Sequence, residues 1–150
     1  MGFTIIGEGA ELARYRTLAA RLQAPVEFCP QAVPNESLPS LFQRFGIYFN
    51  TAQRETHGVT MCEAMATGMP VVGQRVAAIP EYVRDGKDGY LAPRGDRQGL
   101  RERLLELGSN PRLRNALGAS ASEYVREKCS AQKVVATELS VLQGALARGR

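Results

Sequence analysis

Apolar residues along the chain occur in two patterns that predict different elements. Short apolar runs bounded by glycine or proline predict five strands, at 3–6, 26–29, 46–49, 70–73 and 89–92. Between these runs, apolar residues recur three and four positions apart, which predicts helices at 10–22, 35–42 and 58–67 and a helical turn at 79–83. From Asp96 onward the pattern is helical. The sequence therefore predicts an α/β fold, a Rossmann-like parallel sheet flanked by helices with a helical C-terminal third.

Turn and capping residues mark where two of these helices end or begin. Gly68 is typical of the residue that ends a helix, and Asn110-Pro111 is typical of a helix start. The last helix carries an apolar stripe formed by Val135, Leu139, Leu142 and Leu146. Such a stripe either docks a partner or folds onto the chain's own sheet, and the second outcome is the commoner one.

Length and composition narrow the class of protein. The 150 residues suffice for one domain with a sizeable core. Apolar residues make up 44% and charged residues 23%, as in ordinary globular proteins. The net charge of +4 is scattered, without a basic stripe interleaved with aromatic residues, so we expect no nucleic-acid partner.

The three cysteines, Cys29, Cys62 and Cys129, are far apart and have no metal-ligand spacing. We therefore expect buried thiols in a reducing compartment, and no metal site. A catalytic pair of Cys62 with His57 is disfavoured, because their spacing matches no known arrangement. The N-terminal apolar run is too short for a signal peptide and no run is long enough to span a bilayer, so we expect a cytoplasmic protein.

The stretch RETHGVTMCEAMATGMPVV, residues 54–72, contains the strongest functional signal. Glu63 lies among apolar residues of a predicted helix, where a carboxylate is costly to desolvate unless it is paired. The stretch follows a strand, and ligands of open parallel sheets bind at the carboxyl ends of strands. Gly58 permits close approach of a ligand to the backbone, and the N–H groups of the next turn suit an anion. These features predict a ligand with phosphate in the middle and hydroxyl groups at both ends.

Several spaced motifs of the chain resemble one family. They are Glu-x7-Glu at Glu55 and Glu63, EAMA-x-G-x-PVV over 63–72, and PE-x-V-x-DG-x-x-G over 80–89. Upstream, IIGEGAEL and ESLPSLFQRFGIYFNT are similar to the family's strand-glycine step and helix-strand lead-in. Over about residues 3–125 the chain resembles the C-terminal, donor-binding domain of the retaining group 1 glycosyltransferases of GT-B fold.

The resemblance implies a role for each matching position. Glu55 is the implied catalytic residue, in contact with the donor sugar near the reacting carbon. The backbone from Gly58 through Val59 to Thr60 would hold the sugar and the diphosphate. Glu63 would accept hydrogen bonds from the ribose. Three further positions complete the implied donor site: His57, Gly7 at the first strand-glycine step, and Val33 in the loop at 30–33 that would meet the base.

The resemblance also implies the reaction. The full enzyme would transfer a sugar from a nucleoside-diphosphate sugar to an acceptor hydroxyl with retention of anomeric configuration, as in polysaccharide biosynthesis. It would need no metal and no cofactor, and UDP or GDP would carry the sugar in preference to ADP. An acceptor glycan or lipid would bind an N-terminal domain or subunit. Any association with a membrane surface would occur only through that part.

Some family features have no match in the chain. His57 stands where the family has an aromatic or small residue, and Pro30 falls where glycine is common. The family's basic pair, which clamps the diphosphate, lies on a strand and helix that precede the matched region. We expect these elements and the acceptor domain to be absent, with Arg54 or Arg75 as weak substitutes. We therefore expect the isolated chain to bind donor weakly and to transfer little.

Other interpretations stay open. Gly7-Glu8-Gly9 after a strand is a fragment of a dinucleotide motif, but Leu12 occupies the third glycine position. Glu81 and Asp85 form a candidate acid-base pair, although Asp85-Gly86 is typical of a turn. The alternatives for the whole chain are a non-catalytic nucleotide-sugar-binding or interaction module and a different α/β nucleotide-binding protein.

Overall fold

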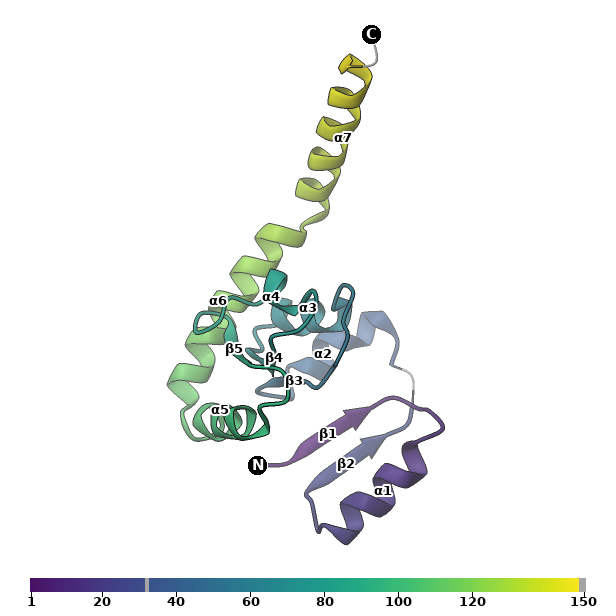
Figure 1. The fold of residues 1–150 in the computed structure, drawn as a ribbon, viewed down its shortest axis with the longest axis vertical. Helices are drawn as coiled ribbons and strands as arrows, with labels where there is room; N and C mark the ends of the chain where they lie inside the picture. Colours follow the sequence, from purple (N-terminus) through teal and green to yellow (C-terminus); the bar gives the residue numbers. More distant parts are fainter. Residues whose placement is uncertain (32, 149–150) are drawn as a thin grey trace. The chain divides into compact units, whose positions relative to one another are not determined.

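The computed structural model of the chain describes residues 1–31 and 33–148 (Figure 1). The chain divides into two compact units, Met1–Leu38 and Pro39–Arg150, called here the N-terminal unit and the C-terminal unit. Helix α2, Leu38–Phe42, starts at the boundary between them.

The N-terminal unit is a strand-helix-strand arrangement. Its elements are β1 (Phe3–Ile6), α1 (Leu12–Arg21), β2 (Val26–Cys29) and the short 3-10 helix η1 (Asn35–Ser37). Strands β1 and β2 are parallel, with Phe3 opposite Val26 and Ile6 opposite Cys29. Both strands have the predicted bounds.

Burial in the N-terminal unit differs from the prediction. None of its described residues is buried, and in β1, predicted as a buried strand, Ile5 and Ile6 are 47% and 37% exposed. Parallel strands are covered when helices pack on both faces of a sheet. Two strands and one helix supply too little surface for that.

The C-terminal unit contains a three-stranded parallel sheet in the order β3-β4-β5. The strands are β3 (Tyr48–Asn50), β4 (Val71–Gln74) and β5 (Gly89–Ala92). The helices are α3 (Val59–Ala66), α4 (Ile79–Tyr82), α5 (Arg97–Ser109), α6 (Pro111–Cys129) and α7 (Ala131–Arg148). The parallel α/β class and the helical C-terminal third are thus confirmed, with the five strands paired as two sheets.

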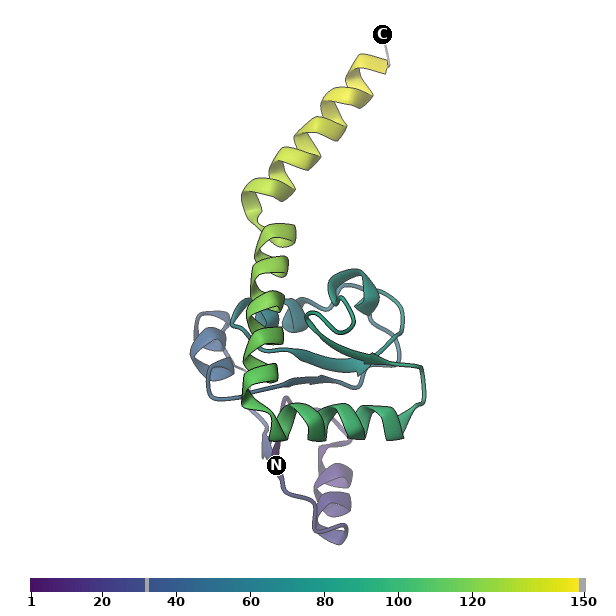
Figure 2. The same ribbon diagram turned by 90° about the vertical axis from the view of Figure 1, so that its left-hand side faces the viewer.

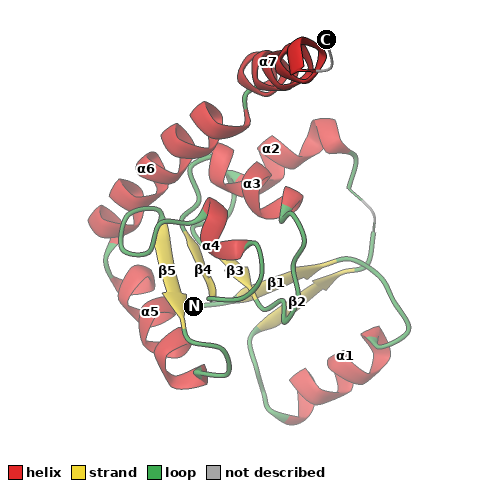
Figure 3. Ribbon diagram, turned by 45° about the horizontal axis from the view of Figure 1, so that its top comes forward, coloured by secondary structure: helices red, strands yellow, loops and turns green. Residues whose placement is uncertain are grey.

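Helices cover both faces of the β3-β4-β5 sheet. Every residue of the central strand β4 is buried, as the continuous apolar run at 70–73 requires. In Figure 2, α5 lies along one face of this sheet and α3 and α4 lie on the other. Figure 3 shows α6 at the side of the strands, where it contacts α3, α5 and β5.

Helix α6 packs closely against the backbone at the C-terminal end of α3. Gly118 of α6 lies so near the backbone oxygen of Gly68 that a Cβ at this position would overlap it. One and two turns further along α6, Ser122 Oγ and Arg126 Nη2 both donate to the carbonyl oxygen of Ala66, each at 2.9 Å. These two donors satisfy a carbonyl at the C-terminal end of α3, where no further helical N–H is available. The α3–α6 crossing is therefore held by packing and by polar contacts.

The buried carboxylate of Asp88 links α6 to the segment between α4 and β5. Asp88 is 0% exposed and accepts hydrogen bonds from Arg84 N, Arg84 Nε and Ser120 Oγ, at 3.0, 2.7 and 2.9 Å. Burial by itself raises the pKa of Asp88, but the hydrogen bonds from Arg84 and Ser120 outweigh it and leave the pKa below its usual value. The carboxylate is therefore ionised at neutral pH.

Helix α7 has no buried residue. It follows α6 after Ser130, whose extended backbone (φ −63°, ψ 139°) separates the two helices, and it runs away from the β3-β4-β5 sheet (Figure 1). The four stripe residues, from Val135 to Leu146, are 52% to 74% exposed. The expectation that the stripe folds onto the chain's own sheet is wrong. None of the helices in residues 1–31 and 33–148 is long and apolar enough to cross a membrane.

Candidate functional site

The loop from Thr51 to Gly58 connects the carboxyl end of β3 to the start of α3. Gly58 adopts a left-handed conformation, with φ 68° and ψ 40°, and its N-cap position carries no side-chain cap. Gly58 is buried, whereas Val59 and Thr60 in the next turn are exposed. The first turn of α3 therefore presents backbone N–H groups that no N-cap side chain satisfies, next to exposed surface.

Glu55 is held against this helix start. Its Oε1 accepts hydrogen bonds from the backbone N–H groups of Gly58 and His57, at 2.9 and 3.3 Å. Its backbone oxygen accepts from Ala78 N in the loop after β4, at 3.1 Å. A carboxylate is favourable at this end of a helix because the peptide dipoles place partial positive charge there. Glu55 is thus fixed in both its side chain and its backbone.

Glu63 lies one helical turn after Val59, so both residues share one face of α3. Glu63 and Glu55 are each partly exposed, and both carboxylates act on the nearby phenol of Tyr48 in β3. Burial raises the pKa of Tyr48, and the charges of Glu55 and Glu63 raise it further. Tyr48 is therefore a neutral hydroxyl near both acids. Sequence reasoning missed it, since a tyrosine in a strand gives no signal beyond apolar character.

His57 has an aromatic neighbour on α4. Its Nε2 lies 3.4 Å from the hydroxyl oxygen of Tyr82, and the two ring centroids are 5.7 Å apart. The ammonium of Lys128 lies 4.6 Å from the centre of the Tyr82 ring. The imidazole of His57 is thus paired with Tyr82. No pattern in the sequence indicates this pairing, because His57 and Tyr82 are 25 residues apart.

The alternative of a nucleophilic Cys62 is not supported. Burial, followed by the neighbouring Cys129, raises the pKa of the Cys62 thiol to about 11. At neutral pH such a thiol carries almost no thiolate, which is the reactive form. The expectation of buried thiols also needs correction, because Cys29 and Cys62 are half-buried and Cys129 is exposed.

Two other candidate groups have structural partners. Arg75 Nη2 donates to Asp85 Oδ2 at 2.7 Å, so the charge of this candidate phosphate clamp is already paired. Asp85 Oδ1 accepts from Leu91 N at 3.0 Å, and Gly86 N donates to Gly89 O at 2.8 Å. Asp85-Gly86 therefore forms the predicted turn, and Asp85 is engaged in it.

The predicted donor residues fall into both units. The C-terminal unit brings together Glu55, His57, Gly58, Val59, Thr60 and Glu63. Gly7 and Val33 belong to the N-terminal unit, where Gly7 N donates to Cys29 O at 3.0 Å. The predicted base-binding loop at 30–33 includes Ala32, which lies outside the described residues. Among residues 1–31 and 33–148, no group of three or more His, Cys, Asp or Glu side chains is placed to hold a metal ion.

Comparison with known proteins identifies the family. The model of the family "Glycosyl transferases group 1" matches residues 2–124, and the chain belongs to this family. It is 36% identical over 84 residues to N-acetyl-alpha-D-glucosaminyl L-malate synthase of Bacillus anthracis, covering 56% of the chain and 22% of that protein. It is 34% identical over 114 residues to amylovoran biosynthesis glycosyltransferase AmsK of Erwinia amylovora, covering 70% of the chain and 28% of that protein.

Solved structures confirm the fold. The crystal structure of HepE from Anabaena in complex with UDP superposes with a TM-score of 0.86 at 18% identity, covering 96% of the chain and 41% of that protein. The similarity therefore extends over nearly all of this chain. The matches span only 22% and 28% of the lengths of the two relatives named above.

Proposed function

We propose that the chain is the donor-binding part of a retaining glycosyltransferase and binds a nucleoside-diphosphate sugar at the N-terminus of α3. The central observation is the placement of Glu55 and Glu63 on either side of the uncapped first turn of this helix. The diphosphate would accept hydrogen bonds from the N–H groups of Val59 and Thr60. HepE was solved with UDP and also with UDP-glucose, which supports UDP as the carrier.

The two acids have different proposed roles because their surroundings differ. Glu63 is partly exposed and lies one turn after the exposed Val59 on the same face of α3, so its oxygens are placed to accept hydrogen bonds from ribose hydroxyls. Glu55 is anchored through one oxygen to the turn that would hold the sugar and diphosphate. An anchored carboxylate beside the donor sugar orients the reacting carbon and stabilises positive charge that develops there as the diphosphate departs.

The loop between Glu55 and α3 would take its shape from its neighbours. The contacts of His57 with Tyr82 and of Ala78 N with Glu55 O connect this loop to α4 and to the loop after β4. Such support limits the motion of the backbone that would meet the sugar.

We propose further that the whole enzyme carries its acceptor site outside these 150 residues, in an N-terminal domain or subunit. The supporting observation is that AmsK, which is named for amylovoran biosynthesis, is matched over only 28% of its length. The 150-residue chain would then bind donor without transferring sugar at an appreciable rate. Transfer would need the part that binds an acceptor glycan or lipid.

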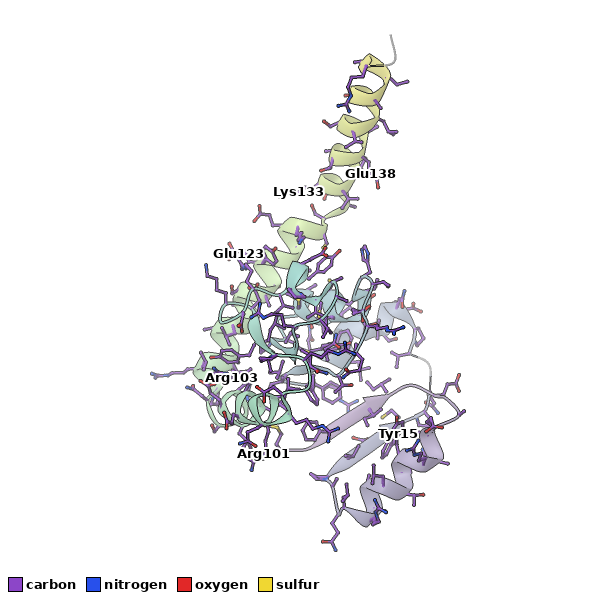
Figure 4. The ribbon with its side chains drawn as sticks, viewed as in Figure 1. Tyr15, Arg101, Arg103, Glu123, Lys133 and Glu138 are labelled. Atoms are coloured by element: carbon purple, nitrogen blue, oxygen red, sulfur yellow. The ribbon has the colours of Figure 1, made fainter. Side chains whose placement is uncertain are left out.

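Saturation-transfer NMR with UDP, UDP-glucose, GDP, GDP-mannose and ADP-glucose tests the donor proposal, because it detects millimolar binding. We expect Glu63→Gln to weaken binding of both nucleotide and nucleotide sugar about tenfold, through lost hydrogen bonds to the ribose. Glu55→Gln should weaken mainly the extra affinity that the sugar provides. The matched control is Glu123→Gln, an exposed glutamate on α6 labelled in Figure 4. Binding that is equal for all four chains would contradict the assigned site.

A further inference from the structure

Two of the three cysteines lie at the α3–α6 crossing. Cys62 belongs to the middle of α3, and Cys129 is the last residue of α6, directly before the break at Ser130. Cys129 is exposed and Cys62 is half-buried, packed against the core of the C-terminal unit. The third cysteine, Cys29, belongs to the N-terminal unit.

The hydrogen bonds of the crossing define how the two helices run. Ser122 and Arg126 of α6 both contact the carbonyl oxygen of Ala66 in α3. Cys129 lies on the same face of α6 as these two residues, because seven and three residues separate it from them along the helix. Cys62 precedes Ala66 by one turn on α3. Cys62 is one turn from Ala66 toward the N-terminus of α3, and Cys129 is one turn from Arg126 toward the C-terminus of α6. The two cysteines therefore lie next to each other at the crossing.

The side chains at the end of the crossing agree with this geometry. The thiol of Cys129 lies close enough to the thiol of Cys62 to help raise the pKa of Cys62. Lys128, next to Cys129, lies over the Tyr82 ring and donates to the carbonyl oxygen of Glu81. The end of α6 is thus held beside α3 and α4 by contacts other than the thiols.

We propose that Cys62 and Cys129 form an intramolecular disulfide when the chain meets a disulfide oxidant such as oxidised glutathione. In the first step the exposed Cys129, as thiolate, attacks one sulfur of the oxidant and releases one glutathione thiolate. In the second step Cys62 loses its proton to solvent, which is easier once Cys129 is a neutral mixed disulfide that no longer raises the pKa of Cys62. The Cys62 thiolate then attacks the Cys129 sulfur and releases the second glutathione thiolate. The balance is two protein thiols and one glutathione disulfide giving one protein disulfide and two glutathione thiols.

The bond would connect two functional regions of the C-terminal unit. Cys62 immediately precedes Glu63 on the helix proposed to bind the donor, and Cys129 immediately precedes the separation of α6 from α7. A disulfide here would fasten the end of α6 to α3 and restrict the chain at the start of α7. The proposal does not depend on donor binding, because the link and its chemistry involve only the two thiols and the α3–α6 crossing.

Thiol mapping of the 150-residue chain tests the proposal. The reduced protein is incubated with oxidised glutathione at pH 8, free thiols are blocked with an alkylating agent, and peptides are identified by mass spectrometry. We expect a linked peptide pair that contains Cys62 and Cys129. The thiol of Cys29 should remain available to the blocking agent or to glutathione. The thermal unfolding midpoint should rise on oxidation and return to its original value with dithiothreitol.

Single variants provide the controls. Cys29→Ser should leave the linked peptide pair and the rise of the midpoint intact. Cys129→Ser and Cys62→Ser should each abolish both, while circular dichroism shows that the helices are retained. The proposal is wrong if the wild-type chain yields only separate glutathione adducts or links through Cys29. It is also wrong if the Cys129→Ser chain shows the same reversible rise as the wild type.

Discussion

The N-terminal unit and the C-terminal unit both place helices beside parallel strands, yet they differ in what those strands bury. In the N-terminal unit β1 pairs with β2, and none of the described residues of the unit is buried. In the C-terminal unit β4 pairs on both sides, and all four of its residues are buried. Both units contain the apolar runs that form strands. Only the C-terminal unit supplies the neighbouring strands and the helices on both sheet faces that bury such an apolar run in a core.

This difference in burial determines which substitutions should change the free energy of unfolding. The C-terminal unit contains the close approach of Gly118 to Gly68, the hydrogen bond from Ser120 to Asp88 and the proximity of Cys129 to Cys62. Each of these joins chain segments that are far apart in sequence. The N-terminal unit is held mainly by its backbone ladder and by exposed side-chain pairs such as Glu11 with Arg14. Matched changes in the two units, or in buried and exposed helices, should therefore have very different effects on the free energy of unfolding.

The largest effect is expected for Gly118→Ala at the α3–α6 crossing. The added methyl group would overlap the carbonyl oxygen of Gly68, which is backbone and cannot move aside cheaply. We expect a loss of about 4 kcal/mol or more in the free energy of unfolding, at the upper end of overpacking effects. The control is Gly144→Ala in α7, where the nearest atom is the end of a flexible arginine at 3.9 Å. That change should raise helix stability by up to about 1 kcal/mol. Urea denaturation measures the free energy of unfolding of both variants.

Truncation of Ile79 should give the next largest effect. This side chain is fully buried in the core of the C-terminal unit, and Ile79→Ala should cost about 3 kcal/mol through lost burial and the remaining cavity. Ile5→Ala in β1 removes the same atoms from a residue that is 47% exposed. Its cost should be about 1 kcal/mol or less. Equal losses in the two urea titrations would show that the units do not differ in packing.

The ion pair of Asp88 with Arg84 should show a smaller effect with a defined pH dependence. Asp88→Asn should cost about 2 kcal/mol at pH 7, a value that allows for the partly exposed guanidinium of Arg84. Because the pKa of Asp88 is lowered from 3.8 in the folded chain, its contribution is complete above about pH 4 and is lost as the pH falls through the folded pKa.

Urea titrations at several pH values check this sign. The difference between wild type and Asp88→Asn should stay constant from pH 7 to about pH 5 and should shrink below pH 4. Glu11→Gln breaks the exposed pair of the N-terminal unit and should change stability by about 0.5 kcal/mol or less. A difference for Asp88→Asn that grows on acidification would contradict the direction of its pKa shift.

The smallest effect concerns the thiol of Cys62 at alkaline pH. Its pKa is raised from 9.0 to about 11, so the folded chain resists a deprotonation that the unfolded chain undergoes earlier. The contribution is complete below pH 9 and is lost between pH 9 and pH 11. Between pH 8 and pH 10 the free energy of unfolding of the reduced wild type should therefore fall by about 1 kcal/mol more than that of Cys62→Ala. Cys29→Ala should follow the wild type, and parallel curves for all three chains would refute the assignment.

Much of this fold follows from local sequence signals. The bounds of β1, β2 and β5 match the apolar runs, because glycine and proline mark both ends. Asn110 caps α6 through its Oδ1, which accepts from Leu113 N at 3.1 Å, as Asn-Pro predicted. Gly68, with φ 90°, ends α3 in a left-handed conformation. Each of these features depends on residues that are neighbours in the sequence.

The features that escaped prediction depend on distant pairs. The contact of Ser120 with Asp88 and the contact of Cys129 with Cys62 involve residues far apart in sequence, and no local pattern indicates which side chains meet. The exposed stripe of α7 escaped for a related reason, because helical periodicity identifies an apolar face without identifying what covers it. In the candidate site, Glu55 and Glu63 were recognised by their spacing, whereas Tyr48 and Tyr82 became visible only through their neighbours.

Amide chemical-shift mapping of the isotope-labelled chain is the most direct test of donor binding at the start of α3. Titration with UDP and with UDP-glucose reports where on the chain the nucleotide binds and whether the sugar adds contacts. We expect saturable shifts concentrated at residues 55–63, with additional shifts near Glu55 for UDP-glucose. Shifts that concentrate elsewhere, or no shifts at millimolar nucleotide in a folded chain, would contradict donor binding at the start of α3.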